Sequence, residues 1–202
     1  MDSVQSFIIE NQGVRVALVR LDQVAQKVLT LNDYSAAVQA VLAEALAGVL
    51  LLASINKVAG RLSLQFQGGK AIQMLSVQYM AGGFVRGLVQ LVEGVTTLDK
   101  AAVLHDLNSG VLSVVYQADH AGRQYQSVVP FVGDSLTESL QHYYMQSEQQ
   151  ATHLQIVFNS QAVVGFMLQA LPEAGQDLEE RWSHVLTLAQ TLAEEELFTC
   201  DN

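Results

Sequence analysis

The sequence predicts an α+β fold in which mostly antiparallel sheets pack around a buried central helix, with an amphipathic helix near the C-terminus. Three observations support this prediction. The stretch 36–55 is apolar enough to be a buried helix. Several segments alternate polar and apolar residues, as half-buried strands do. Short glycine-rich turns join these segments, which favours hairpins over crossover connections.

The central helix is expected at 36–55, with Ser35 as its N-cap. This stretch is long enough to span a bilayer. It carries Gln39, Glu44 and Gly48, however, and its flanks lack the basic pattern of an inserted segment. We therefore expect a helix buried in the core of a soluble protein.

Period-two segments follow the central helix. Strands are expected at 61–67, 72–79 and 84–92, with turns at 68–69 and 81–83. Three strands joined by glycine-rich turns predict an antiparallel meander.

A short helix is expected at 100–107. It is followed by a hairpin with strands at 111–118 and 123–132 and a turn at 119–122.

The next segment begins with a helix signal. Ser135 and Glu138 have the spacing of a capping box, and the helix should run to about Ser147. A second strand pair is expected at 152–158 and 162–171.

The last helix is expected over Leu178–Leu197, where apolar residues recur at helical spacing. The glutamates at 194–196 would lie near its C-terminal end, where the helix dipole disfavours negative charge, so the helix needs packing to persist. We expect a core domain at 1–175 and a helical arm at 176–202, and the arm is our candidate for an exchanged or interfacial element.

The composition excludes some functions and favours a contact surface. The chain has 202 residues, of which 50% are hydrophobic and 15% charged, with a net charge of −10. This acidic balance argues against nucleic acid as a partner, and against docking on an anionic membrane. Because few charges are available to cover the surface, we expect exposed apolar area that contacts a partner or a second copy.

The single cysteine, Cys200, cannot by itself form an intrachain disulfide or a zinc site. A reactive thiol, an intersubunit disulfide and an inert terminal thiol all stay open for it. The first residues show no secretory signal, so a cytoplasmic location is expected.

Histidine patterns give little support for catalysis. The five histidines are His105, His120, His142, His153 and His184. They have no metal-ligand spacing, which favours ordinary surface or core roles, and no GxSxG motif is present. A hydrolase that uses His105, beside Asp106, or His142 remains an alternative function.

Three further motifs favour structural roles over functional ones. The glycines before Lys70 join two strands and do not lead into a helix, so a hairpin turn is preferred to a phosphate site. Gly165 in a strand indicates a close backbone approach. The cluster Tyr143, Tyr144 and Met145 could be an adaptable binding surface, but at helical spacing it is more often core.

Six segments together are similar to a known family. They are Asp33-Tyr34 with Leu42 to Leu46, Leu62 to Gly68, Val85 to Gly87, Tyr125 to Val129 with Gly133 to Leu136, Tyr143 to Gln149 with Thr152 to Leu154, and Met167 to Pro172. In order and spacing they resemble the N-terminal domain of the 33 kDa chaperonin family (heat shock protein 33), redox-regulated holdase chaperones of the bacterial cytoplasm. The match covers nearly the whole chain.

The chain departs from the family pattern at several positions. Ser127, Lys70-Ala71 and Ala151 stand where family members usually have Gly, Gly-Pro and Pro. Family members also continue through a linker into a small domain whose four cysteines, in CxC and CxxC pairs, bind one zinc. None of those four metal ligands is present, and Cys200 does not match their pattern. We therefore expect this chain to be part of a longer protein, and a natural loss of the zinc domain is the alternative.

The resemblance implies a chaperone that works without ATP and is not an enzyme. Oxidation of the zinc-bound thiolates would form disulfides, release zinc and unfold the linker, which uncovers an apolar face for unfolding client proteins. Oxidised subunits would form a homodimer. This chain would be the client-binding and dimerising part, with no cofactor of its own and with zinc in the full-length protein.

Because the linker and zinc domain are missing, we expect an uncovered face that suppresses aggregation without redox control. The residues of that face are not assigned: the strand with Leu62, Leu64 and Phe66 has one face for the core and one for something else. A purely structural dimerisation module is a third interpretation.

Overall fold

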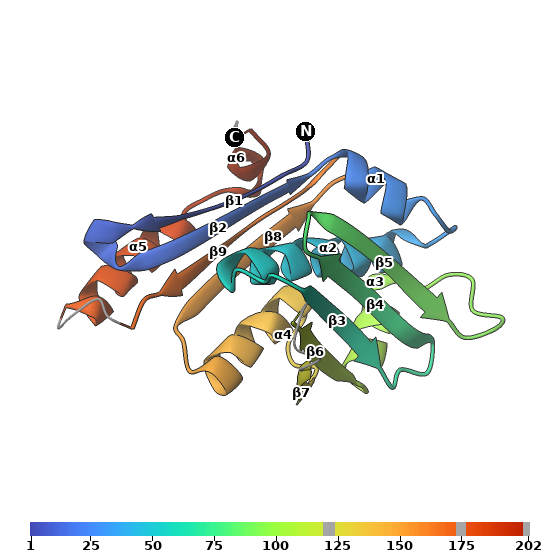
Figure 1. Cartoon of the computed structure of the whole chain (residues 1–202). Coiled ribbons are helices and arrows are strands. Elements are labelled where there is room, and N and C mark those ends of the chain that lie inside the picture. The colour runs from blue at the N-terminus through green and yellow to red at the C-terminus, as the bar shows by residue number, and fades with distance from the viewer. Residues whose placement is uncertain (119–123, 173–176, 200–202) are drawn as a thin grey trace.

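The computed structural model of the chain describes residues 1–118, 124–172 and 177–199 (Figure 1). The strands are β1 (Ser3–Ile9), β2 (Val14–Leu21), β3 (Arg61–Gln67), β4 (Ile72–Met80), β5 (Phe84–Leu91), β6 (Val111–Gln117), β7 (Gln124–Pro130), β8 (Thr152–Phe158) and β9 (Val163–Ala170). The helices are α1 (Gln23–Leu29), α2 (Ala36–Ile55), α3 (Lys100–Leu107), α4 (Leu136–Tyr143), α5 (Leu178–Gln190) and α6 (Glu194–Thr199), with short helical turns η1 (Glu10–Gln12) and η2 (Tyr144–Glu148).

The strands form two antiparallel sheets, which confirms the predicted α+β class. One sheet has four strands in the order β1-β2-β9-β8, and the other has five in the order β5-β4-β3-β6-β7. Helix α2 contacts strands of both sheets and lies at the centre of the molecule (Figure 1). The meander β3-β4-β5 and the hairpin-connected pairs β6-β7 and β8-β9 all have the predicted antiparallel pairing.

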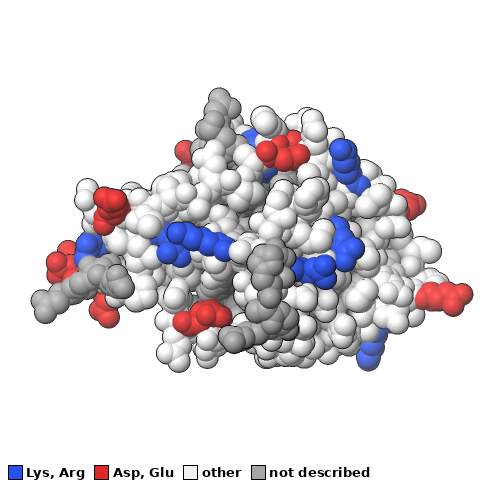
Figure 2. Space-filling model, viewed as in Figure 1, with Lys and Arg blue, Asp and Glu red and all other residues white. Residues whose placement is uncertain are grey.

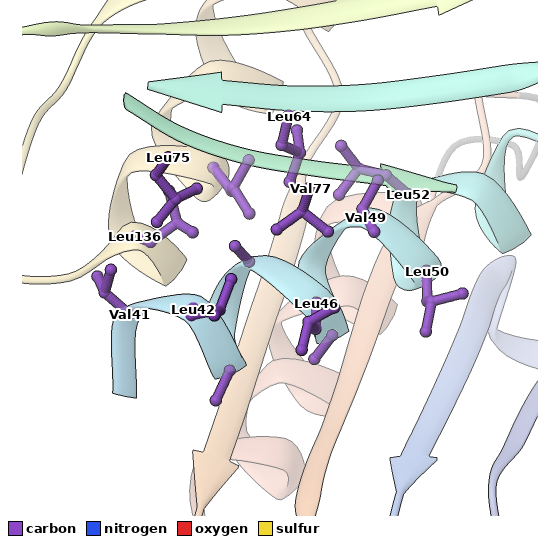
Figure 3. Close-up of a cluster of buried hydrophobic side chains, with 14 of the residues drawn as sticks. Val41, Leu42, Leu46, Val49, Leu50, Leu52, Leu64, Leu75, Val77 and Leu136 are labelled. Carbon is purple, nitrogen blue, oxygen red and sulfur yellow. The ribbon is translucent and has the colours of Figure 1, made fainter. Parts of the chain in front are cut away.

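Helix α2 is the core of the fold. Figure 3 shows Leu42, Leu46 and Val49 of α2 among Leu64 and Val77 of the five-stranded sheet. Among the described residues, α2 is the one helix long and apolar enough to cross a membrane, and 78% of its most apolar window is buried inside the protein. A helix that is apolar on all sides needs such burial, as the sequence predicted.

Ser35 stands at the N-cap position of α2 in extended backbone, but its side chain makes no cap hydrogen bond. The hydroxyl instead donates to the Leu98 carbonyl at 2.8 Å. The predicted position is therefore right, and the predicted capping interaction is wrong. The hydroxyl ties the start of α2 to the loop before α3.

The elements within residues 1–35 were not predicted from the pattern. Strands β1 and β2 form a hairpin, and α1 follows before α2. Strand β2 is buried on both faces over much of its length, so its polar-apolar alternation is weak. Strand β1 is mostly exposed and has no buried face to mark it.

Helix α4 begins as predicted and ends differently. The Ser135 hydroxyl accepts the Glu138 N–H at 3.1 Å, but the Glu138 carboxylate accepts the N–H of Asp134 at 2.9 Å, one residue before the expected partner. The α-helical geometry ends at Tyr143. The chain then continues to Glu148 as the π-helical turn η2, so the predicted extent is nearly right while the geometry changes.

The predicted single helix over Leu178–Leu197 is wrong: two helices, α5 and α6, occupy this region. The acidic run 194–196 lies in the first turn of α6, where the helix dipole favours negative charge. The Glu196 carboxylate also accepts the Ala193 N–H at 2.8 Å. The acidic run therefore starts a helix where the sequence reasoning placed it at a helix end.

The predicted turn 119–122 and the predicted strand start at Arg123 lie outside the described residues, as do His120 and Cys200.

Candidate functional site: an apolar sheet face under two short helices

The side of the four-stranded sheet that faces away from α2 is strongly apolar. Strand register places apolar side chains opposite one another across all four strands. They are Phe7 and Ile9 on β1, Val14, Val16 and Leu18 on β2, Val164, Phe166 and Leu168 on β9, and Val157 on β8. We call this surface the outer apolar face.

The five-stranded sheet is different. On β3, the side chains that face the core around α2 are those of Leu62, Leu64 and Phe66. The sequence left open which face of this strand is buried, and the structure assigns these three residues to the core. The opposite face carries a polar network in which the Gln78 amide donates to the Ser63 hydroxyl at 2.9 Å, and Arg86 donates to Gln78 Oε1 at 2.7 Å. The outer apolar face therefore belongs to the four-stranded sheet.

Helices α5 and α6 lie against the outer apolar face. Trp182, Val185 and Ala189 of α5 pack into the same cluster as the strand residues, and α6 adds Leu197 and Phe198. The sequence predicted an uncovered face, and this expectation is wrong for the described part of the chain. The physical reason is the apolar stripe of α5, which needs a buried partner surface.

The cover is incomplete. A cavity of about 490 Å³ remains between the helices and the sheet, lined by side chains such as Leu18, Phe166 and Val185. Phe7, Leu188 and Leu192 line the same cavity and are exposed, Leu188 with 55% of its surface. A rim of exposed apolar side chains around an apolar cavity is typical of a contact surface.

Among the described residues, two arginine side chains bond the helices to the rest of the protein. Arg20 on β2 donates to the Phe198 carbonyl at 2.8 Å and also to the Asp22 carboxylate at 3.1 Å. Arg181 on α5 donates to the Asn11 carbonyl at 3.4 Å, a long bond. Because α6 has only six residues, it cannot persist without its contacts to the sheet.

His153 lies at the β8 side of the outer apolar face. Its ring centroid is 5.7 Å from that of Phe166, and burial lowers the pKa of its imidazole. Its Nε2 atom is buried without a hydrogen-bond partner among the described residues. The lowered pKa favours the neutral ring, which suits an apolar surface.

Charged residues near this face belong mainly to the covering helices: α5 carries Glu179, Glu180 and Arg181, and α6 carries the run 194–196. Figure 2 shows the molecule in the orientation of Figure 1, with uncharged side chains over most of the visible surface and a small number of acidic and basic residues among them. This agrees with the low content of charged residues, 15%.

The predicted catalytic alternative finds no support in the geometry. Asp106 is buried, and its carboxylate accepts the backbone N–H groups of Lys70, Ala71 and Ile72 at 2.6–3.1 Å. It is thus committed to the β3-β4 loop and not to orienting His105, which is exposed on α3. The same bonds show that this glycine-rich loop is closed by a carboxylate of the chain.

The remaining predicted residues are dispersed. His142 lies on α4, His153 on β8 and His184 on α5 at the cavity wall. Within the described ranges, no group of three or more His, Cys, Asp or Glu side chains could hold a metal ion. Gly165 makes the predicted close approach, since a Cβ there would lie 3.0 Å from Ile156 Cγ1.

The aromatic cluster on α4 is mostly core. Tyr143 and Tyr144 are buried, and Met145 is exposed. Tyr143 donates to the Glu148 carboxylate at 2.9 Å, and burial raises its pKa to about 12. Tyr144 accepts the Asn56 amide at 2.8 Å, and burial raises its pKa too. The bond from Asn56 ties the π-helical turn to the end of α2. The pKa values raised by burial keep both hydroxyls protonated.

One carboxylate of the central helix is also buried. Glu44 accepts the backbone N–H and the hydroxyl of Thr137, both at 3.0 Å, at the N-terminus of α4. Burial raises its pKa above the usual range, and the bonds from Thr137 oppose that shift. Glu44 therefore ties α4 to α2.

Comparison with known proteins gives a consistent result. The family model described as Hsp33 protein matches residues 2–202. Proteins named 33 kDa chaperonin are 35% identical in Neisseria meningitidis serogroup A over 96% of this chain and in Pseudomonas savastanoi over all of it. The chain spans 64% and 68% of their respective lengths.

The fold has also been seen before. The crystal structure of the 33 kDa chaperonin from Thermotoga maritima matches with a TM-score of 0.76 at 22% identity, over 98% of this chain and 70% of that one. This likeness supports the two-sheet architecture.

The sequence reasoning did not identify the outer apolar face. The alternation in β1 and β2 was its one available signal: Phe7 and Ile9 on one strand and Val14, Val16 and Leu18 on the next. That signal was missed because β2 also buries Ala17 and Val19 on its other side.

Proposed function

The chain belongs to the Hsp33 family of chaperones, and from this premise we propose that it is an ATP-independent holdase that captures unfolding proteins on the outer apolar face. The relatives are named chaperonins and not enzymes, which fits a binding function. Clients would be held by burial of their apolar side chains against this face, without chemistry.

The observation that carries this proposal is the combination of an apolar sheet face with an incomplete, weakly tied cover. Apolar faces of this kind are normally buried in a core or an interface. Here the cover consists of α5 and a six-residue helix, and it leaves a cavity of about 490 Å³ with an exposed rim. A client could therefore enter at the rim and displace α6 from the sheet.

We further propose that redox control acts on this cover. In a full-length protein a linker and a four-cysteine zinc domain would stabilise the covered state, and oxidation with loss of zinc would weaken it. Dimer formation and a cytoplasmic location belong to the same proposal. The described part of this chain would supply the surface that the switch exposes.

The test is light scattering from a client protein that unfolds on heating, with and without the chain, under reducing conditions and without ATP. We expect suppression at stoichiometric amounts. Leu188→Ser should weaken it, because this leucine stands at the rim of the cavity. The matched control is Leu88→Ser, an exposed leucine on the five-stranded sheet, which should leave suppression unchanged.

Two results would contradict the proposal. If the folded chain suppresses no aggregation under reducing or oxidising conditions, the holdase function is wrong for this chain. If both leucine variants lose suppression equally, client capture is not localised on the outer apolar face.

A further inference from the structure

The two sheets have four edge strands: β1 and β8 in one, and β5 and β7 in the other. An edge strand carries backbone N–H and C=O groups without a partner strand, and these can pair with another chain. Proteins normally protect such edges with charged side chains, prolines, bulges or covering groups.

Each of the other three edges carries at least one such feature. On β8, the N–H of Leu154 donates to the Gln141 side chain of α4 at 2.8 Å. On β5, the Tyr34 hydroxyl donates to the Val89 carbonyl at 2.8 Å and accepts the Val89 N–H at 3.0 Å. Strand β7 ends in Pro130, which has no N–H to offer.

Among the described residues, none of these devices is found at positions 4–9 of β1. Its seven residues, SVQSFII, contain no charge and no proline, and its register with β2 is unbroken by a bulge. In the part of the chain that the structure describes, no side chain bonds to the backbone of residues 4–9. Val4, Phe7 and Ile8 are each exposed by 42–48%.

The space beside β1 suits an added strand on both faces. Phe7 and Ile9 line the cavity of the outer apolar face. On the other face Val4 lines a second cavity, of about 370 Å³, whose wall includes Tyr79 and Val85 of the five-stranded sheet. Because side chains of a strand alternate between faces, a strand paired with β1 would direct its side chains toward both cavities in turn.

We propose that the edge of β1, over residues 4–9, binds an extended, uncharged segment of an unfolding protein as a fifth strand of the four-stranded sheet. This inference rests on the proposed function and adds a mode of recognition to it. Backbone hydrogen bonds to β1 do not depend on the sequence of the bound segment. The two cavities would favour segments with apolar side chains at alternate positions. A second copy of the chain is a less favourable occupant, because each copy carries a net charge of −10.

The test uses a fluorescent seven-residue peptide of alternating valine and threonine, matching the length of β1. Its twin has alternate backbone amides N-methylated, which keeps the apolar side chains and removes the pairing edge. We expect the 202-residue chain to bind the unmodified peptide and to bind its twin about tenfold more weakly or worse, as the loss of several hydrogen bonds requires. Hydrogen exchange at residues 4–9 should slow when the peptide is bound.

A pair of variants tests the location. Ser6 is exposed at the centre of β1. Ser6→Lys places a charge on the edge and should reduce peptide affinity about tenfold, in the way natural edge strands are blocked. Ser6→Thr keeps the strand preference and should bind like the wild type. Circular dichroism establishes that each variant is folded. If Ser6→Lys does not fold, the comparison of the two peptides on the wild-type chain decides.

The outcomes separate this inference from the proposed function. Equal binding of both peptides, or unchanged binding to Ser6→Lys, overturns the edge-pairing mode even if client aggregation is suppressed. A dimer that is lost in Ser6→Lys, with no peptide binding, shows that the edge holds a second copy and also overturns it. Peptide binding at β1 without suppression of client aggregation supports the edge and refutes the holdase function.

Discussion

The docking of α6 on the sheet can be tested with one side chain. Leu197 is 6% exposed and is the one buried residue of α6. We expect Leu197→Ala to release α6 from the outer apolar face without unfolding the two sheets. The main core around α2 lies on the other side of the four-stranded sheet and does not include Leu197.

The size of the effect follows from the contacts. A buried Leu-to-Ala change costs about 2–5 kcal/mol. Among the described residues, α6 also contacts the sheet through the half-buried side chain of Phe198. Arg20 donates a hydrogen bond to the backbone carbonyl of Phe198. A full shift of a two-state equilibrium from 1:99 to 99:1 needs about 5.5 kcal/mol. If α6 is undocked in about 1% of molecules, half of that free energy, about 2.7 kcal/mol, raises the undocked fraction to about one half. The substitution is therefore large enough to populate the undocked state.

The assay combines two measurements on the folded protein. Binding of a hydrophobic dye such as ANS should rise well below the unfolding temperature, and amide hydrogen exchange should become fast in α6 while it stays slow in α2. The matched control is Leu88→Ala, since Leu88 is exposed on the five-stranded sheet and does not line this cavity. It should bind dye like the wild type.

One result would refute this reasoning. If Leu197→Ala lowers the unfolding temperature of the whole chain in a single transition, with no added dye binding before it, then α6 is part of the cooperative core. The proposed entry of clients beneath α6 would then be wrong as well.

Three other predictions concern the scaffold. Asp106→Asn should lower the free energy of unfolding by about 2–3 kcal/mol in urea titrations, because the buried carboxylate accepts three backbone N–H groups of the β3-β4 loop; an unchanged stability would refute this. Gly165→Ala should lower the free energy of unfolding by about 1–3 kcal/mol in the same titration, since the added Cβ would crowd Ile156. The control is Gly83→Ala, where no atom lies near the added Cβ but φ is positive, so that it measures backbone strain without crowding. For Glu44 the folded pKa is raised by burial, so its protonation favours the folded state and stability is lost as pH rises through that pKa. Wild type should therefore gain stability relative to Glu44→Gln as pH falls from 7 toward 4.5, and a constant difference between the two would contradict the raised pKa.

Most secondary structure after residue 35 was predictable because local patterns there agree with burial. Helix α2 has the predicted bounds, and β3 and β8 do too, since most of their apolar positions face the core around α2. The break between α5 and α6 was not predictable in this way. The apolar period runs through both helices, and the break depends on how each contacts the sheet.

The outer apolar face shows the same limit. The sequence indicated an apolar contact surface through its low charge, and family resemblance indicated a chaperone. The composition could not say which strands form that surface, since a strand such as β2 has apolar residues on both sides. Ser63 and Gln78 make the outward face of the other sheet polar, which leaves the four-stranded sheet as the one with an apolar outward face. These two residues lie 15 positions apart in the chain, so a local pattern does not reveal their contact.

What the sequence by itself determined is the fold class, the central helix and the antiparallel pairing of the later strands, because these depend on local periodicity and turn residues. Only the tertiary structure decided which sheet turns an apolar face away from the core, that α5 and α6 cover this face incompletely, and that β1 is an unprotected edge. The physical reason is that exposure and pairing are properties of surfaces assembled from distant segments. A strand pattern fixes the alternation of side chains, and the neighbouring elements decide whether each side meets a core, a cover or solvent.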